Sequence, residues 1–254
     1  MVERWSEEEG YYLHGFAVPP AALWLAWRRR EIAREPGPRA TGAGLALLVA
    51  ATLLQVPAAL LEIHFVSGAA LLLAVTGLVL ALGGRPALRA YLPALLLLPF
   101  MVPMPLAAVA RANLELKMLA AGAALELARS LGVVVVRDGA ALVLEGGRVL
   151  VVGTVCSGLR FVVSLTALGA FVALASPLPV RRRVALFLLS LPVGLVGNVL
   201  RILVLVVVAD RAGVEAVQGT VHDVSGVLLF GGALAALLGL EALLGRGLRP
   251  EAAS

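Results

Sequence analysis

Seven stretches of the chain are apolar over roughly the length that a helix needs to cross a bilayer. A hydrocarbon core of about 30 Å requires roughly 20 apolar residues in a helix. The first stretch is short and is interrupted by Pro19 and Pro20. We predict an all-α polytopic membrane protein with about seven transmembrane helices, forming one integral membrane domain over residues 1–254. The predicted spans are residues 13–27, 43–62, 64–82, 90–109, 157–175, 184–208 and 224–245.

Composition excludes several other classes of protein. Of the 254 residues, 61% are hydrophobic and only 15% are charged, whereas a soluble domain has about 25% charged residues. The single cysteine excludes a disulfide framework and a cysteine-rich zinc site. The net charge of +5 could suggest a nucleic-acid partner. The positions of the arginines fit a membrane better, so we expect no nucleic acid to bind.

Basic residues are concentrated in short segments between the predicted spans and in the tail. With seven spans, these segments all lie on one side, which the positive-inside rule makes cytoplasmic. The acidic N-terminus then lies outside and the C-terminus inside. This predicts a multi-pass protein of the cytoplasmic (inner) membrane, in contact with membrane lipids. The basic segments are residues 28–41, 83–89, 176–183 and 246–249, which hold 12 of the 21 basic residues.

One connection is much longer than the others. Residues 110–155 are predicted to form an extracytoplasmic loop between the fourth and fifth spans. Its first part, residues 111–131, has helical spacing and sparse charges, as an interfacial amphipathic helix does. Three β-rich pieces follow, and Asp138-Gly139 and Gly146-Gly147 separate them as hairpin-turn dipeptides do. We predict a small antiparallel meander on the outer membrane surface, leading directly into the fifth span.

Polar and ionisable residues collect near the predicted outer ends of the spans. An ionisable group inside a membrane is costly, so each one is a functional candidate. Asn198 and Arg201 are three residues apart and therefore lie on one face of the sixth span. The remaining candidates are Cys156, Ser157 and Arg160 at the start of the fifth span, and His222 and Asp223 at the start of the seventh.

These residue types could carry out acyl transfer. The helix dipole and nearby arginines would favour the thiolate of Cys156. His222 could take up the thiol proton and later protonate a leaving amine. The guanidinium group of Arg201 could stabilise the oxyanion that develops on an attacked carbonyl.

Each residue also has a simpler interpretation, and the sequence pattern alone leaves these alternatives open. Cys156 could be a small packing residue, and His222 an interfacial residue. Either arginine could snorkel or pair with an acidic residue, and Asn198 could bond a neighbouring helix. The three histidines could hold a metal, but His14 and His64 have no paired ligand at useful spacing. We therefore expect no metal and no cofactor.

Three short motifs, in chain order, resemble those of the exosortase/archaeosortase family. The family patterns are C-S-G-[IL]-R, N-x-x-R and H-x-x-x-G. The likeness extends to residues 14–30, to residues 99–105 and to the hairpins before the cysteine. Thr154 departs from it, because many relatives carry an acidic residue at this position. The matching residues are Cys156-Ser157-Gly158-Leu159-Arg160, Asn198-Val199-Leu200-Arg201 and His222-Asp223-Val224-Ser225-Gly226.

The resemblance implies a membrane-embedded cysteine transpeptidase whose active site faces outward. Its substrates would be secreted proteins with a C-terminal sorting signal of the PEP-CTERM type, which has a short motif, a hydrophobic helix and a basic tail. Cys156 would form a thioester, His222 would act as acid and base, and Arg201 would stabilise the oxyanion. The supporting residues would be Arg160, Asn198, Ser157, Gly158 and Gly226.

Two other functions compete with this one. The main alternative is a non-catalytic membrane assembly factor for polysaccharide or envelope export, which would need no cysteine. A transporter is less favoured, because the helix interiors lack the midplane polar groups that transporters use.

Overall fold

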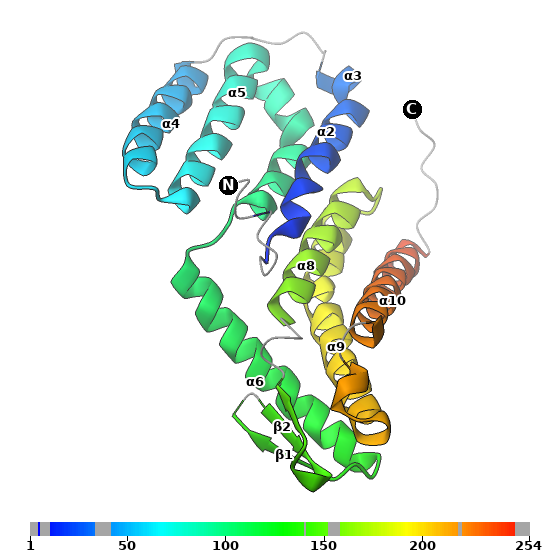
Figure 1. Cartoon of the computed structure of the whole chain (residues 1–254). Helices are drawn as coiled ribbons and strands as arrows, with labels where there is room; N and C mark the ends of the chain where they lie inside the picture. The colour runs from blue at the N-terminus through cyan, green and yellow to red at the C-terminus, as the bar shows by residue number, and fades with distance from the viewer. Residues whose placement is uncertain are drawn as a thin grey trace. The chain divides into compact units, whose positions relative to one another are not determined.

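The structure of the chain is a computed structural model. It describes residues 5, 11–33, 42–139, 141–151, 158–217 and 220–246, without the side chains of residues 151, 220, 222 and 223. In these ranges the chain is mostly helical and contains one small sheet (Figure 1). The chain divides into two compact units, Met1–Leu106 and Ala107–Ser254.

The first unit is helical, and small residues bring its two longest helices close together. A Cβ atom on Gly44 of α4 would lie 2.5 Å from the backbone nitrogen of Ala81 in α5. Such close approach at glycine is typical of helix pairs in membranes. The elements of this unit are η1 (Leu13–Phe16), α2 (Val18–Arg28), α3 (Arg30–Ala33), α4 (Gly42–Leu60), α5 (His64–Leu97) and η2 (Leu98–Met101).

Helix α5 consists of two helical arms rather than one continuous helix. Gly84 has φ 67° and ψ −165° inside it, a conformation that glycine adopts readily. The ribbon folds back on itself between these arms (Figure 1). The predicted spans 64–82 and 90–109 begin in these arms. The second prediction ends too late, because α5 stops at Leu97 and the backbone of residues 102–105 is not helical.

Three side chains of the N-terminal segment hold the proline-rich segment that follows α5. Trp5 Nε1 donates to the carbonyl oxygen of Met101 at 2.9 Å, and His14 Nε2 donates to that of Phe100 at 3.1 Å. The amide of Met104 donates to the Tyr12 hydroxyl oxygen at 3.0 Å. Burial lowers the pKa of His14, and the hydrogen bond to the Phe100 carbonyl opposes this shift only in part.

The second unit contains the predicted antiparallel meander, whose strand order is β1-β2-β3. Val136 lies opposite Val143, which in turn lies opposite Val149. Gly139 and Gly146 have positive φ at the two turns, as the turn dipeptides predict. The elements are α6 (Leu106–Ser130), β1 (Val135–Asp138), β2 (Ala141–Leu144), η3 (Glu145–Gly147), β3 (Val149–Val151), α8 (Gly158–Ala175), α9 (Val180–Ala212), η4 (Val214–Val217) and α10 (Thr220–Gly245).

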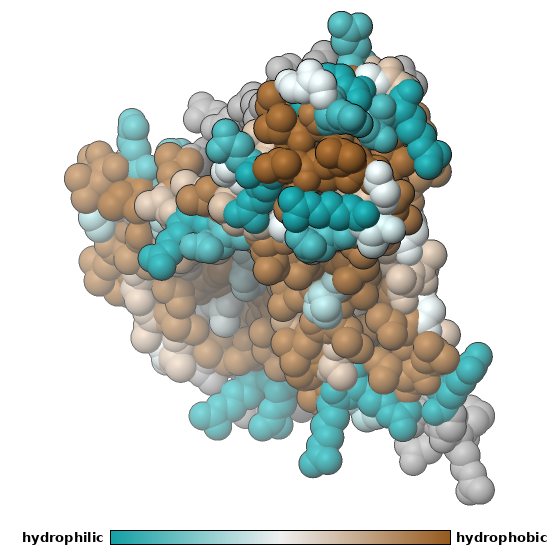
Figure 2. Space-filling model, turned by 90° about the horizontal axis from the view of Figure 1, so that it is seen from below, coloured by the Kyte–Doolittle hydropathy of each residue, from teal (hydrophilic) through white to brown (hydrophobic). Residues whose placement is uncertain are grey.

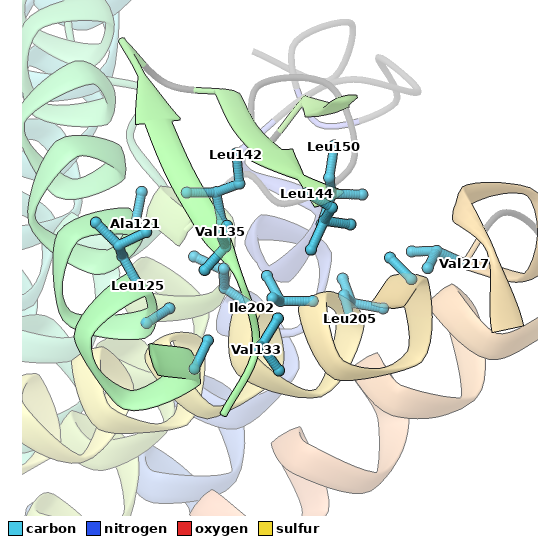
Figure 3. Close-up of a cluster of buried hydrophobic side chains, with 14 of the residues drawn as sticks. Ala121, Leu125, Val133, Val135, Leu142, Leu144, Leu150, Ile202, Leu205 and Val217 are labelled. Atoms are coloured by element: carbon cyan, nitrogen blue, oxygen red, sulfur yellow. The ribbon is translucent and has the colours of Figure 1, made fainter. Parts of the chain in front are cut away.

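One face of the meander packs with α6 and α9 into a hydrophobic core (Figure 3). Side chains alternate along the strands, so that Val135 is buried while Val136 is exposed. On α9, the first fully buried member of the core is Ile202, the residue after Arg201, and the partly buried Val199 also packs against it. The meander therefore fixes the part of α9 that carries Arg201. The labelled members are Ala121, Leu125, Val133, Val135, Leu142, Leu144, Leu150, Ile202, Leu205 and Val217.

Five described helical segments are long and apolar enough to cross a membrane, so the predicted count of seven is not confirmed. The first predicted span, 13–27, is not among them. Helix α2 has 11 residues and covers only about 16 Å at 1.5 Å per residue. The five segments are Gly42–Leu60, His64–Met101, Gly158–Ala175, Val180–Ala212 and Val224–Gly245.

Hydrophobic side chains cover much of the surface in the view of Figure 2, and hydrophilic ones lie in groups between them. Many large apolar side chains on the candidate spans are exposed, for example Leu53 and Leu82. Exposed apolar surface of this extent is expected where lipid, rather than water, is the surrounding solvent. The placement of α6 and the meander on the outer membrane surface stays a prediction.

Candidate active site

Helix α9 packs against both α8 and α10. Small residues permit the close approach: a Cβ atom on Gly197 would lie 2.8 Å from Cε1 of Phe161 in α8 and 3.8 Å from Cβ of Ala233 in α10. The three helices share a buried core, which includes Phe161, Leu165, Leu186 and Leu237. Side chains that project from the next turns of α9 are therefore held between α8 and α10.

Asn198 projects from α9 toward the start of α8. Its side chain is 1% exposed. A Cβ atom on Gly158, the first residue of α8, would lie 2.5 Å from Nδ2 of Asn198. The amide therefore occupies the space that any larger residue at position 158 would need. No residue that the structure describes forms a hydrogen bond with Oδ1 of Asn198.

Arg201 lies three residues further along α9 and contacts α10. A Cβ atom on Gly226 would lie 3.2 Å from Nη2 and 3.4 Å from Cζ of Arg201. The guanidinium group thus rests against the backbone of α10. Position 222 precedes Gly226 by four residues in the same helix, so the two positions share one helix face.

The structure therefore connects the three sequence motifs pairwise. Gly158 of the first motif contacts Asn198 of the second, and Arg201 of the second contacts Gly226 of the third. Arg160 is half-buried in the first turn of α8.

The other predicted site residues are less fully placed. Cys156, Ser157 and Thr154 lie outside the described residues. His222 and Asp223 are described only by their backbone in α10. That Cys156 and His222 meet at Arg201 stays a prediction.

Two arginines carry charge among the side chains of this site that the structure describes. Arg160 and Arg201 both lie in candidate spans, and α8 contains no acidic residue. Interactions of a guanidinium group are stronger in such surroundings than in water, because the local dielectric constant is lower. The arrangement can hold an anionic oxygen, which is the chemistry that acyl transfer requires. Within the described ranges, no three His, Cys, Asp or Glu residues group closely enough to hold a metal.

Sequence reasoning missed one residue that positions α9. Arg148, just before β3, donates from Nη1 to the carbonyl oxygens of Ala209 and Asp210, at 3.0 and 3.2 Å. Its Nη2 also lies 3.8 Å from Oδ1 of Asp210. An arginine that satisfies the last carbonyls of a helix stabilises its C-terminal end. Nothing in the local sequence around Arg148 indicates a contact some 60 residues away.

Ser225 was also missed as a buried polar residue. It is 8% exposed and precedes the glycine that contacts Arg201. The sequence did carry a signal for it, because Ser225 is a polar residue within the apolar start of a span. A hydroxyl that is buried there needs a hydrogen-bond partner, so such a position is a candidate for a polar contact.

The chain matches one family of known proteins over most of its length. A family model described as transmembrane exosortase matches residues 5–239, nearly the whole chain, including all three motifs. No curated protein and no solved structure matches the chain. The match and the apolar helices identify a multi-pass membrane protein of a sorting-enzyme family. The chain belongs to the transmembrane exosortase family.

Proposed function

We propose that the protein is a cysteine transpeptidase that cleaves C-terminal sorting signals of the PEP-CTERM type from exported proteins. The observation that carries the proposal is the pairwise contact of the three motifs along one face of α9. Gly158 lies two residues after Cys156, and Gly226 lies one turn after His222. Gly158 contacts Asn198, and Gly226 contacts Arg201. These contacts support a site in which the thiol and the imidazole lie near Arg201.

The first half of the reaction forms a thioester. The Cys156 thiolate attacks the carbonyl carbon of the scissile peptide bond, and the negative charge moves to the carbonyl oxygen. The guanidinium group of Arg201 donates hydrogen bonds to this oxyanion. Protonated His222 then gives its proton to the leaving amine, the C–N bond breaks, and the hydrophobic tail departs.

The second half releases the substrate protein. A second nucleophile, an amine or water, attacks the thioester carbonyl and loses its proton to His222. The oxyanion forms again at Arg201, and the C–S bond breaks to regenerate the thiolate. Supply of the amine makes the reaction a transpeptidation, and supply of water makes it a hydrolysis.

The position of Arg201 inside a candidate span suits this role. A cation at that depth is costly to keep, but it interacts strongly with an oxyanion because little water competes. The planar guanidinium group has its donors in a fixed fork. Gly226 lets this fork lie close to the helix backbone, and Asn198 occupies the neighbouring space at the start of α8.

Membrane topology would bring the substrate to the site. We propose an inner-membrane protein with its C-terminus inside and its active site facing outward. A substrate with a motif, a hydrophobic helix and a basic tail would obey the same charge rule, with its basic tail in the cytoplasm. Its motif would then lie at the outer end of its helix, level with the site.

The test is co-expression with a substrate that carries such a C-terminal signal, followed by measurement of the substrate's size. The wild-type protein is expected to shorten the substrate, and Cys156→Ala is expected to leave it intact at equal membrane levels. Processing by Cys156→Ala at the wild-type rate would contradict the proposal and favour the non-catalytic assembly factor.

A further inference from the structure

An apolar groove lies between α9 and α10, next to the candidate site. Its volume is about 390 Å³, which is within the range of about 300–1,000 Å³ that small-ligand sites occupy. Ser225 is the one polar residue among the described lining residues, and it is almost fully buried. The lining residues are Val204 of α9 and Val221, Val224, Ser225, Leu228 and Leu229 of α10.

The groove adjoins Arg201 along both helices. Val204 follows Arg201 by three residues, so the two lie on one face of α9. Ser225 precedes Gly226, whose backbone contacts the guanidinium group. Residues 221–229 cover about 12 Å along α10 at 1.5 Å per residue. The groove therefore runs past the level of the guanidinium group and on into the candidate span.

Part of the groove wall is uncovered. Val224 is 49% exposed and Leu228 is 67% exposed, although both line a concave surface. The lining side chains that the structure describes carry no charge, so among them a charged group would lose its hydration without gaining a partner. The groove accordingly favours apolar side chains.

We propose that this groove binds the first apolar residues of the substrate's hydrophobic segment, directly after the cleaved bond. This inference rests on the proposed function, which places the scissile carbonyl at Arg201. An extended chain advances about 3.3–3.6 Å per residue, so the next three residues lie within about 10 Å of that carbonyl. The groove offers an apolar surface over this distance. Val204, Val224 and Leu228 would then determine which substrate residues are accepted.

The first test fills the groove. Val224→Trp places a large ring in it, whereas Val227→Trp makes the same change three residues further along α10, at a position that is 73% exposed and does not line the groove. We expect Val224→Trp to slow processing at least about tenfold, because one misfitting methylene already costs about 10–200-fold in an apolar pocket. Val227→Trp should process at nearly the wild-type rate.

The second test enlarges the groove. The test compares two substrates, one with Phe and one with Val at the first apolar position. The ratio of the Phe rate to the Val rate should be higher for Val224→Ala than for the wild type. Alkylation of Cys156 by a small thiol reagent should be equal in all three variants, because the role proposed for the groove is to bind substrate and not to activate the thiol. A shift in preference of this kind is not expected if a lipid chain fills the groove.

Each outcome separates the inference from the proposed function. Equal slowing by the two tryptophan variants, or an unchanged Phe-to-Val preference in Val224→Ala, would overturn the groove assignment. Normal processing by Cys156→Ala would instead overturn the proposed function, whatever the groove variants do.

Discussion

The contact between Gly226 and the guanidinium group of Arg201 makes a specific prediction for Gly226→Ala. The added Cβ atom would lie 3.2 Å from Nη2 and 3.4 Å from Cζ. Ordinary contacts of such atoms are about 3.5–4.0 Å, so the guanidinium group must move by a few tenths of an ångström. The helix itself gains about 0.5–1 kcal/mol from replacing glycine with alanine. The variant should therefore be folded and present at normal levels.

The rate should nevertheless fall. Removing one oxyanion donor costs about 10²–10³ in rate, and a misplacement of 1 Å can cost about 10². A shift of a few tenths of an ångström should accordingly cost roughly tenfold. Gly232→Ala is the matched control, because it lies in the same helix and no atom lies within 4 Å of its added Cβ.

The assay is the rate of substrate shortening in membranes that contain equal amounts of each variant. We expect Gly226→Ala to be roughly tenfold slower than Gly232→Ala. Equal rates for the two variants would refute the role of the Arg201–Gly226 contact. Combining Gly226→Ala with Arg201→Lys should add little to the effect of Arg201→Lys alone, because both changes act on the same donor group.

Three further predictions follow from the contacts. Arg201→Lys keeps the charge but loses the planar fork, so processing should fall at least about tenfold at normal protein levels; a wild-type rate would reduce Arg201 to a structural residue. Gly158→Ala should lower the melting temperature, because the added Cβ atom would lie 2.5 Å from Nδ2 of Asn198. Adding Asn198→Ala should restore part of the lost stability. Purely additive effects of the two changes on the melting temperature would contradict the contact. Burial lowers the pKa of His14 below 6.5, so the folded protein favours the neutral ring. The contribution of His14 to stability is therefore full above pH 6.5 and is lost as the pH falls through the lowered pKa. The melting temperature of His14→Gln should depend less on pH in this range, and an unchanged pH dependence would show that other groups cause it.

Helices that are long and mostly apolar could be predicted from the sequence. The predicted spans 43–62, 157–175, 184–208 and 224–245 agree with α4, α8, α9 and α10 to within a few residues at most ends. Mean hydropathy over a window of about 20 residues is enough to locate such runs. The meander could be predicted because glycines stand at both turns.

The errors have identifiable physical causes. Hydropathy extended the fourth predicted span to residue 109, although Pro99, Pro103 and Pro105 break the helix between α5 and α6. Residues 13–27 are apolar enough for a span, but α2 begins only at Val18 and is too short. Apolar composition does not distinguish a continuous helix from two short elements.

The site could be predicted only as a set of motifs. Their order along the chain does not show that Gly158 faces Asn198 or that Gly226 faces Arg201, because both contacts depend on how α8, α9 and α10 rotate against one another. The groove was not predicted for the same reason. In the sequence, Val204 and Val224 look like any lipid-facing valines, and only the packing of α9 against α10 makes them neighbours.

The most direct measurement is the chemical identity of the substrate's new C-terminus when processing occurs in the presence of hydroxylamine. Hydroxylamine intercepts a thioester by attacking its carbonyl carbon, which leaves a hydroxamate on the substrate and frees the Cys156 thiol. We predict a C-terminal hydroxamate at the cleavage site with the wild-type protein and none with Cys156→Ala, as read by mass spectrometry. A substrate that loses its tail without ever forming the hydroxamate, or that forms it equally in the Cys156→Ala strain, would contradict a thioester on Cys156.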